Sequence, residues 1–423
     1  MSSFVKLSNV IIFLFLISSS IFINGCDNTT VDPTITGVTI NGIVGDAKGG
    51  GIGGLTVIIN GSTATTASDG SFAINNITTP YDVKIMQSGV SVPTGILYRD
   101  ISSINPVLYA PGITSSINSS LLTVNTPGIS AAQTAKVYFT DGLNIESIGT
   151  IASSSASTSF TVKWPGSSSI TGKVIVLIYT KIGSEIVSYN YYGEKSGFVL
   201  SNGSPSTATF TSAELPAVSG DTIVSGTVTA PSGYSSVTSS LQLTFRLQGS
   251  NMNAESLVTF LGSNFSFRIP KALTSTFRTL INGSANGTSS GAQTTKSSQV
   301  AVGSTGNNLI LDEVPSLTAP TTTTNIDTTT TFSFVPGTGS GVNLISYAST
   351  SANFYVFTNY SACTIPNFSA FGLGLGSSVS YQWNVQKLSG ISNTNNMVSG
   401  IVLNNANLVG TANSEIRSFT TTP

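Results

Sequence analysis

The segment Val38-Thr39-Ile40-Asn41-Gly42-Ile43-Val44 alternates apolar and polar residues, the pattern of a β-strand with one buried face. An apolar run at residues 55–59 follows and ends at Asn60-Gly61, a pair that favours a tight turn. Residues 67–74 and 81–85 continue the β-pattern after further turn residues. Short strands separated by glycine-rich turns predict a small β-sandwich.

Asp69 and Gly70 mark a sharp reversal within this stretch. Glycine adopts positive φ without steric cost, and a strand that restarts after the turn places Phe72 and Ile74 on the same face. We expect Asp69 to be a turn residue and not a metal ligand, since no other acidic residue lies close to it in the sequence.

The order of these features resembles the carboxypeptidase regulatory-like domain over roughly residues 35–110. The resemblance is carried by Gly42, Val44, Gly53, Val57, Asp69, Gly70, Phe72, Ile74, Tyr81 and Val83. It implies a transthyretin-like β-sandwich that holds no catalytic residues. We therefore assign residues 34–110 to such a module.

The N-terminus has the layout of an export signal. Lys6 precedes an uncharged apolar segment, residues 10–22, which is shorter than the roughly 20 residues that span a bilayer. Ile23-Asn24-Gly25-Cys26 then resembles the bacterial lipobox, with Asn24 as a departure from its usual small residue. An ordinary signal peptide with an incidental cysteine is the alternative.

The lipobox resemblance implies that residues 1–25 are removed and that Cys26 is lipidated and becomes the first residue of the mature chain. Two or three acyl chains hold a protein at a membrane essentially permanently. We expect residues 26–33 to be a tether. We place the mature protein in the cell envelope and favour the outer membrane or the cell surface over the inner membrane.

The composition excludes several classes of function. Charged residues make up 8% of the chain, against about 25% in ordinary proteins, and the net charge is −1, so no basic patch exists for nucleic acid. The chain has 0 histidines, which removes the usual general base and the commonest metal ligand. We predict no enzymatic activity, no catalytic residues, no metal and no cofactor. A carboxylate-based hydrolase is the weakest alternative, because the 17 acidic residues are scattered apart from Asp312-Glu313.

The middle of the chain contains an internal echo. Residues 160–165 and 265–270 share the pattern Phe, Ser or Thr, apolar, cation, apolar, Pro, and they begin 105 residues apart. A period near 100 residues is the size of one sandwich, so we predict sandwiches at residues 111–220 and 221–315. Val224-Ser225-Gly226-Thr227-Val228 also resembles the start of the first module.

The last segment, residues 316–423, differs from the others. Tyr381-Gln382-Trp383-Asn384-Val385 late in the segment and Ser418-Phe419-Thr420-Thr421 near its end resemble a fibronectin type III-like sandwich. We expect Trp383 and Trp164, which fall in different modules, to be core residues. We expect Cys363, within an apolar run, to be a buried and inert thiol.

One aromatic cluster could contact a ligand, namely Tyr189, Tyr191 and Tyr192. Strand alternation predicts that Tyr189 and Tyr191 share one face and that Tyr192 lies on the other. These rings either pack in the core or stack on sugar rings.

Together these patterns predict an all-β chain of tandem β-sandwich modules behind an N-terminal signal and lipid anchor. We expect a string of modules for binding, adhesion or envelope scaffolding, with the membrane and an envelope protein or polysaccharide as partners. The alternative is a polysaccharide-binding accessory lipoprotein that uses the three tyrosines.

Overall fold

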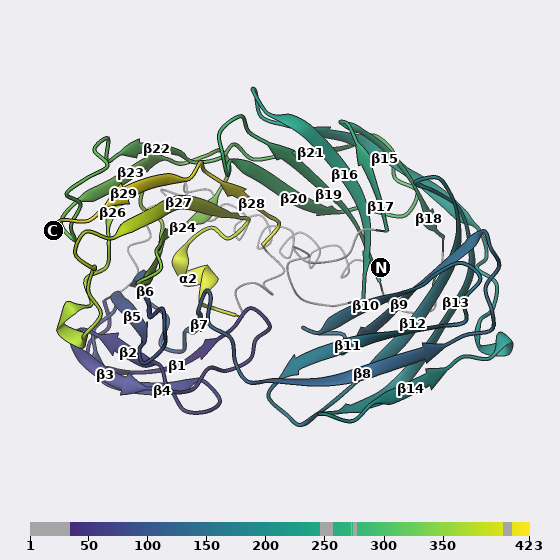
Figure 1. The fold of residues 1–423 in the computed structure, drawn as a ribbon, viewed down its shortest axis with the longest axis horizontal. Helices are drawn as coiled ribbons and strands as arrows, with labels where there is room; N and C mark the ends of the chain where they lie inside the picture. Colours follow the sequence, from purple (N-terminus) through teal and green to yellow (C-terminus); the bar gives the residue numbers. More distant parts are fainter. Residues whose placement is uncertain (1–33, 246–256, 272, 274–276, 401–407) are drawn as a thin grey trace, which may run out of the picture. The chain divides into compact units, whose positions relative to one another are not determined.

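The computed structural model describes residues 34–245, 257–271, 273, 277–400 and 408–423. Residues 35–423 form one compact unit. The fold is all-β, as predicted (Figure 1). Among the described residues, the only α-helix is the single turn α2, Thr394–Met397.

The strands fall into four consecutive groups. The first group contains β1 Val38–Gly45, β2 Thr56–Ile59, β3 Ser62–Thr65, β4 Ser71–Ile77, β5 Tyr81–Gln87, β6 Thr94–Ile101 and β7 Val107–Tyr109. The second contains β8 Ile117–Asn125, β9 Gln133–Thr140, β10 Glu146–Ile151, β11 Ser157–Pro165, β12 Ser169–Ile182, β13 Glu185–Ser201, β14 Ser206–Thr209 and the short 3-10 helix η1 Ser212–Glu214. The third contains β15 Asp221–Thr229, β16 Ser235–Thr244, β17 Val258–Leu261, β18 Asn264–Pro270, β19 Arg278–Asn286, β20 Gln293–Gln299 and β21 Asn307–Ile310. The C-terminal group contains β22 Ser316–Ala319, β23 Thr331–Val335, β24 Gly341–Ala348, β25 Asn353–Thr358, β26 Ala362–Thr364, the 3-10 helix η2 Ser369–Phe371, β27 Ser380–Ser389, α2, β28 Gly410–Asn413 and β29 Arg417–Thr420.

The first three groups share one topology. In each, the first described strand pairs antiparallel with the fourth and parallel with the seventh, as in the sheet β4-β1-β7. The remaining strands form a second sheet in the order third, second, fifth, sixth, as in β10-β9-β12-β13. Each group therefore has two sheets with the same connections between them.

The internal echo in the sequence falls at equivalent places in this topology. Phe160 lies in β11 and Phe265 lies in β18, and both are the fourth strand of their group. The segment that begins at Val224 lies in β15, the first strand of the third group, just as the alternating segment at residue 38 opens β1. The echo thus reflects residues that serve the same position in two sandwiches.

The C-terminal group is built differently. One sheet has the order β22-β23-β26, and the other contains β25, β24 and β27, with β28 and β29 both pairing with β27. The strand position beside β27 is therefore filled in two pieces, β28 and β29, which lie on either side of Ser414 in the sequence. The Ser414 hydroxyl accepts a hydrogen bond of 2.9 Å from the Val385 amide.

The C-terminal group also pairs with two other groups. β25 runs parallel to β6 of the first group, with Asn353 opposite Thr94 and Phe357 opposite Tyr98. β28 runs antiparallel to β20 of the third group. These pairings join strands of three groups into one continuous sheet. In this respect the structure differs from the expected string, because the last group in sequence contacts the first.

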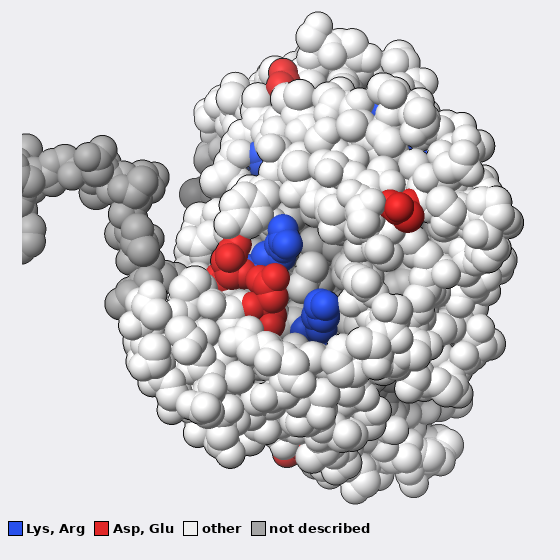
Figure 2. Space-filling view, turned by 90° about the vertical axis from the view of Figure 1, so that its left-hand side faces the viewer, with Lys and Arg blue, Asp and Glu red and all other residues white. Residues whose placement is uncertain are grey.

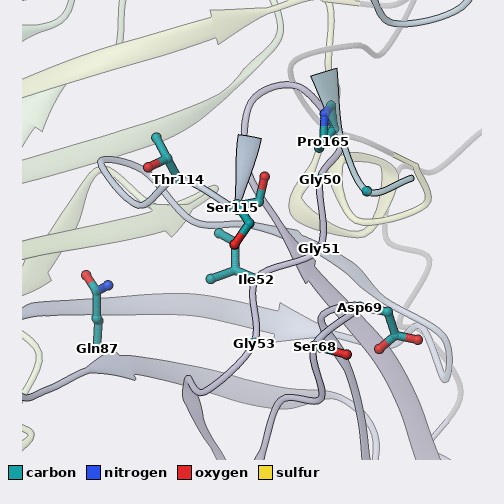
Figure 3. Close-up of a pocket in the computed structure, with 13 residues that line it drawn as sticks. Gly50, Gly51, Ile52, Gly53, Ser68, Asp69, Gln87, Thr114, Ser115 and Pro165 are labelled. Atoms are coloured by element: carbon teal, nitrogen blue, oxygen red, sulfur yellow. The ribbon is translucent and has the colours of Figure 1, made fainter. Parts of the chain in front are cut away.

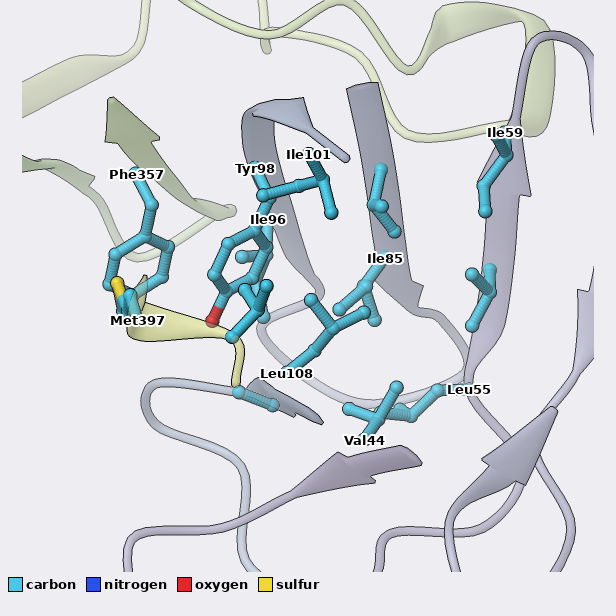
Figure 4. Close-up of a cluster of buried hydrophobic side chains, with 14 of the residues drawn as sticks. Val44, Leu55, Ile59, Ile85, Ile96, Tyr98, Ile101, Leu108, Phe357 and Met397 are labelled. Carbon is cyan, nitrogen blue, oxygen red and sulfur yellow. The ribbon is translucent and has the colours of Figure 1, made fainter. Parts of the chain in front are cut away.

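The hydrophobic cores are likewise shared between strand groups. Figure 4 shows Phe357 and Met397 of the C-terminal group beside Tyr98 in the core of the first group. The rings of Tyr98 and Phe357 stack with centroids 4.4 Å apart. A second shared core joins the second and third groups, with Leu177 and Phe267 among its members.

The predicted core residues lie where the sequence indicated. Trp164 and Trp383 are buried, and Cys363 is a buried free thiol. Gly70 has φ +80°, and Phe72 and Ile74 are both buried in the first core, as expected of the turn before β4.

Candidate functional site

The three predicted tyrosines lie on β13, but not as strand alternation suggested. Tyr191 is opposite Ile178 and Tyr189 is opposite Tyr179, so Asn190 is an extra residue that creates a β-bulge. Because one inserted residue reverses the side-chain alternation, Tyr189 and Tyr192 share a face and Tyr191 lies on the other. The prediction that Tyr189 and Tyr191 share a face was wrong for this reason.

Two of these tyrosines are structural. Tyr189 and Tyr192 belong to the core shared by the second and third groups. The Tyr189 hydroxyl donates to the Arg268 carbonyl at 2.9 Å, and burial raises the pKa of Tyr189. The Tyr192 hydroxyl donates to Glu194 Oε2 at 3.1 Å. Their rings are buried and present no face on which a sugar could stack.

Tyr191 is 41% exposed and forms one wall of a pocket of about 420 Å³. The pocket lies beside the loop before β9 and the helix η1, and its other lining residues are Pro127, Gly128, Ile129, Ser130, Gln133, Ile178, Ser212 and Leu215. The walls combine an aromatic ring and aliphatic side chains with hydroxyl and amide groups. Such a lining suits a ligand with one apolar face and a polar edge.

A larger pocket of about 710 Å³ lies between the first and second groups. Figure 3 shows Gln87, Ser115 and Pro165 among the residues that line it around the glycine-rich turn at residues 49–53. A Cβ on Gly51 would lie 1.9 Å from the Asp69 carbonyl oxygen, so this turn can approach its neighbour only as glycine.

Asp46 holds this junction together. Its Oδ1 accepts hydrogen bonds from the amides of Lys48 and Gly50, at 2.8 and 2.9 Å. Its Oδ2 accepts from the amide and the hydroxyl of Ser115, at 3.1 and 2.6 Å. The Asp46 carboxylate is thus fully used as a structural acceptor. Asp69 is exposed and accepts from Ser71, whose hydroxyl lowers the pKa of the Asp69 carboxyl, as befits a turn residue.

A third site, which we call the charged hollow, is formed by Asp82, Arg99, Asp100 and Tyr360. Its volume is about 350 Å³. Figure 2 views the molecule from the side on which β5 and β6 lie. Acidic and basic side chains gather there in a hollow, and most of the surrounding surface is uncharged. Arg99 Nε lies 3.8 Å from Asp82 Oδ2, and a hydrogen bond to the Asp100 side chain raises the pKa of Tyr360.

Sequence reasoning missed the charged hollow because its members are far apart in the chain. Asp82 lies on β5, Arg99 and Asp100 lie on β6, and Tyr360 follows β25 of the C-terminal group. The available signal was the polar position Asp82 between the buried Tyr81 and Val83, which marks a residue on the outer face of the sheet.

The predicted lipidation site, Cys26, lies outside the described residues. Within the residues that the structure describes, no helix combines the length and apolar character needed to cross a membrane. The same residues contain no cluster of three or more His, Cys, Asp or Glu side chains placed to hold a metal ion.

No protein-family model and no curated protein matches the chain. Among solved structures, the Bacillus anthracis TIE protein is 10% identical over 65% of this chain and half of its own length (50%), with a TM-score of 0.17. A Ca²⁺-stabilized adhesin that helps an Antarctic bacterium bind ice is 12% identical over 92% of this chain and 100% of its own, also with a TM-score of 0.17. BcpA, the major pilin subunit of Bacillus cereus, is 8% identical over 64% of this chain and 98% of its own, with a TM-score of 0.14. TM-scores of this size carry no argument about function.

Proposed function

We propose that this chain is an exported lipoprotein of the cell envelope whose β-sandwiches bind or scaffold and do not catalyse. The observation that carries the proposal is the lipobox-like sequence that ends at Cys26, placed directly after an apolar segment too short to span a bilayer. A chain with 0 histidines behind that anchor lacks the side chain on which most general acid–base catalysis relies.

Metabolic labelling tests the anchor. The full chain and a Cys26→Ser variant are expressed in a lipoprotein-processing bacterium that is fed an alkyne fatty acid. We expect the label and membrane association in the full chain, with both lost in the variant. Cys363→Ser is the matched control, since its buried thiol cannot carry the lipid, and it should label normally. Equal labelling of the full chain and Cys26→Ser would contradict the proposal.

A second candidate function is polysaccharide binding at Tyr191. The observation that favours it is the exposed Tyr191 ring in a pocket that also offers Ser130, Gln133 and Ser212. An aromatic face can cover the apolar face of a sugar while hydroxyl and amide groups bond its oxygens. Tyr191→Ala should then abolish retention on an immobilised polysaccharide, whereas Tyr191→Phe should keep most of it. Equal retention of Tyr191→Ala and the unaltered chain would remove this candidate.

A further inference from the structure

A β-bulge gathers three of the side chains in the charged hollow. Between the pairs Tyr81–Ile101 and Val83–Tyr98, β5 has the single residue Asp82 while β6 has Arg99 and Asp100. Asp100 adopts φ +56°, a conformation that aspartate and asparagine tolerate better than most residues. Bulges re-aim side chains and recur beside binding sites. Here the bulge brings two carboxylates and a guanidinium to one pocket.

The C-terminal group holds this bulge in place and completes the pocket. The side chain of Asn395 in α2 accepts from the Ser102 amide at 2.6 Å and donates to the Asp100 carbonyl at 3.3 Å. Tyr360, from the loop after β25, adds a ring that is 52% exposed. The pocket therefore exists only where the first and C-terminal groups meet.

The charges of the hollow decide what it can hold. A small anion would face the carboxylates of Asp82 and Asp100, and a metal ion would face the Arg99 guanidinium. Asp82 Oδ1 accepts a hydrogen bond from the Asp100 amide at 3.1 Å, which ties the two strands together at the bulge. Asp82 Oδ2 lies 3.8 Å from Arg99 Nε, which is an ion pair and not a hydrogen bond, so this oxygen and the guanidinium can turn to a ligand. A neutral ligand rich in hydroxyl groups uses both signs of charge, because hydroxyls both donate and accept.

We propose that the charged hollow binds a neutral saccharide, with Asp82 and Asp100 accepting from sugar hydroxyls, Arg99 donating to sugar oxygens and Tyr360 covering the apolar face of a sugar ring. This inference deepens the proposed binding function and rests on it. Short charge-assisted hydrogen bonds supply specificity at such a site, and the exposed aromatic ring supplies contact area. Nothing in the hollow is required to form or break a bond.

The test uses the full chain in detergent on an array of neutral, N-acetylated and uronic-acid oligosaccharides, with calorimetry on each saccharide retained. We expect at least one neutral saccharide to bind, and Tyr360→Ala and Asp100→Asn each to weaken that binding by about tenfold or more, the loss of one strong contact. Asparagine also tolerates positive φ, so Asp100→Asn keeps the bulge. Asp69→Asn, an exposed aspartate on the same group, is the matched control and should bind as the unaltered chain does.

The remaining outcomes separate the possibilities. Unaltered affinity in Tyr360→Ala, with its thermal midpoint unchanged, overturns the proposal whatever Asp100→Asn does. Binding lost only in Tyr191→Ala assigns the saccharide to the other pocket and also overturns it. Calcium binding that Asp82→Asn removes, without saccharide binding, shows a cation site instead. Retention of no saccharide overturns the proposal too, while fatty-acid labelling at Cys26 decides the anchoring role independently.

Discussion

Burial governs the chemistry of the second cysteine. Cys363 is 6% exposed, and its sulfur lies 3.2 Å from the Tyr347 hydroxyl. Burial raises the pKa of the Cys363 thiol to about 11. Since the thiolate is the reactive form, this residue should be chemically silent in the folded protein at ordinary pH.

We therefore predict that Cys363 resists alkylation while the protein is folded. In the Cys26→Ser variant, which leaves Cys363 as the single thiol, iodoacetamide at pH 8 should label the chain only after denaturant is added. Mass spectrometry measures the label over time. Rapid labelling without denaturant would mean that the thiol is exposed and that the core around β26 is open.

At the surface, hydrogen bonds lower the pKa of the Glu214 carboxyl, whereas burial raises the pKa of the Cys363 thiol. Hydrogen bonding to Lys195, and then to the amide and hydroxyl of Thr211, lowers the pKa of the Glu214 carboxyl from 4.5 to about 2. A carboxyl whose pKa is depressed on folding stabilises the protein above its unfolded pKa and loses that effect as the pH falls through its folded pKa.

The stabilisation by Glu214 should therefore fade between about pH 4.5 and pH 2. Glu214→Gln should melt below the unaltered chain at pH 6, and the two melting temperatures should converge as the pH falls through this window. Glu185→Gln, an exposed glutamate on β13, serves as the control. A melting-temperature difference that stays constant down to pH 2 would rule out this role of the Glu214 charge.

Within individual strands, a single inserted residue determines which way the side chains point at the Tyr191 pocket and at the charged hollow. Asn190 in β13 turns Tyr191 outward, and the extra residue in β6 places Arg99 and Asp100 together opposite Asp82. Alternation in the sequence correctly predicts β1, β4 and β5 of the first group, since side chains along a strand alternate with a period of two. A bulge leaves no such signature, because it depends on which partner residue lies opposite. For this reason the sequence indicated that Tyr189, Tyr191 and Tyr192 lie on a strand, but it gave the wrong direction for the Tyr191 side chain.

The contribution of the turn after β1 to stability can be tested by substituting Asp46. Asp46 is 5% exposed and accepts four hydrogen bonds that tie its own turn to Ser115 ahead of β8. Each hydrogen bond to a charged group contributes about 1.5–3 kcal/mol, and removing the acceptor leaves buried donors unsatisfied. Asp46→Ala should therefore lower the free energy of unfolding by at least about 3 kcal/mol.

Chemical denaturation measures this loss, and a double-mutant cycle locates it. Ser115→Ala should cost less than Asp46→Ala, and the double variant should cost less than the sum because the two residues share their bonds. Asp69→Asn should change the free energy of unfolding by only about 0.5 kcal/mol, as for an exposed residue. Additive losses at Asp46 and Ser115 would show that the two residues act independently.

Across the whole molecule, the pairing of the first and last strand groups is the feature that the sequence did not predict. Residues 57–59 of β2 and residues 354–357 of β25 are continuous apolar runs, and most of their side chains are buried on both faces of the strand. Continuous apolar runs indicate that both faces of a strand are covered, but they do not say by what. The partners β6 and β25 are separated by most of the chain, so only the folded structure identifies them.

Substitution of Phe357 tests the pairing of β6 with β25. Its buried ring stacks on Tyr98 and contacts the edge of Tyr109, and Phe to Ala in a core costs about 3–5 kcal/mol. In Phe357→Ala, hydrogen exchange should accelerate in β6 as well as in β25. Phe267→Ala removes an equally buried ring from the third group and should leave exchange in β6 unchanged. Protected β6 amides in Phe357→Ala would contradict the role of this contact.

The proposed lipid anchor at Cys26 would hold the folded chain at a membrane, and the proposed function depends on it. Its most direct test is the mass of the N-terminal peptide of the protein purified from membranes of a lipoprotein-processing bacterium. We predict a peptide that begins at Cys26 and carries the mass of a diacylglyceryl group. A peptide that begins at another residue, or an unmodified Cys26, would contradict the proposed lipid anchor.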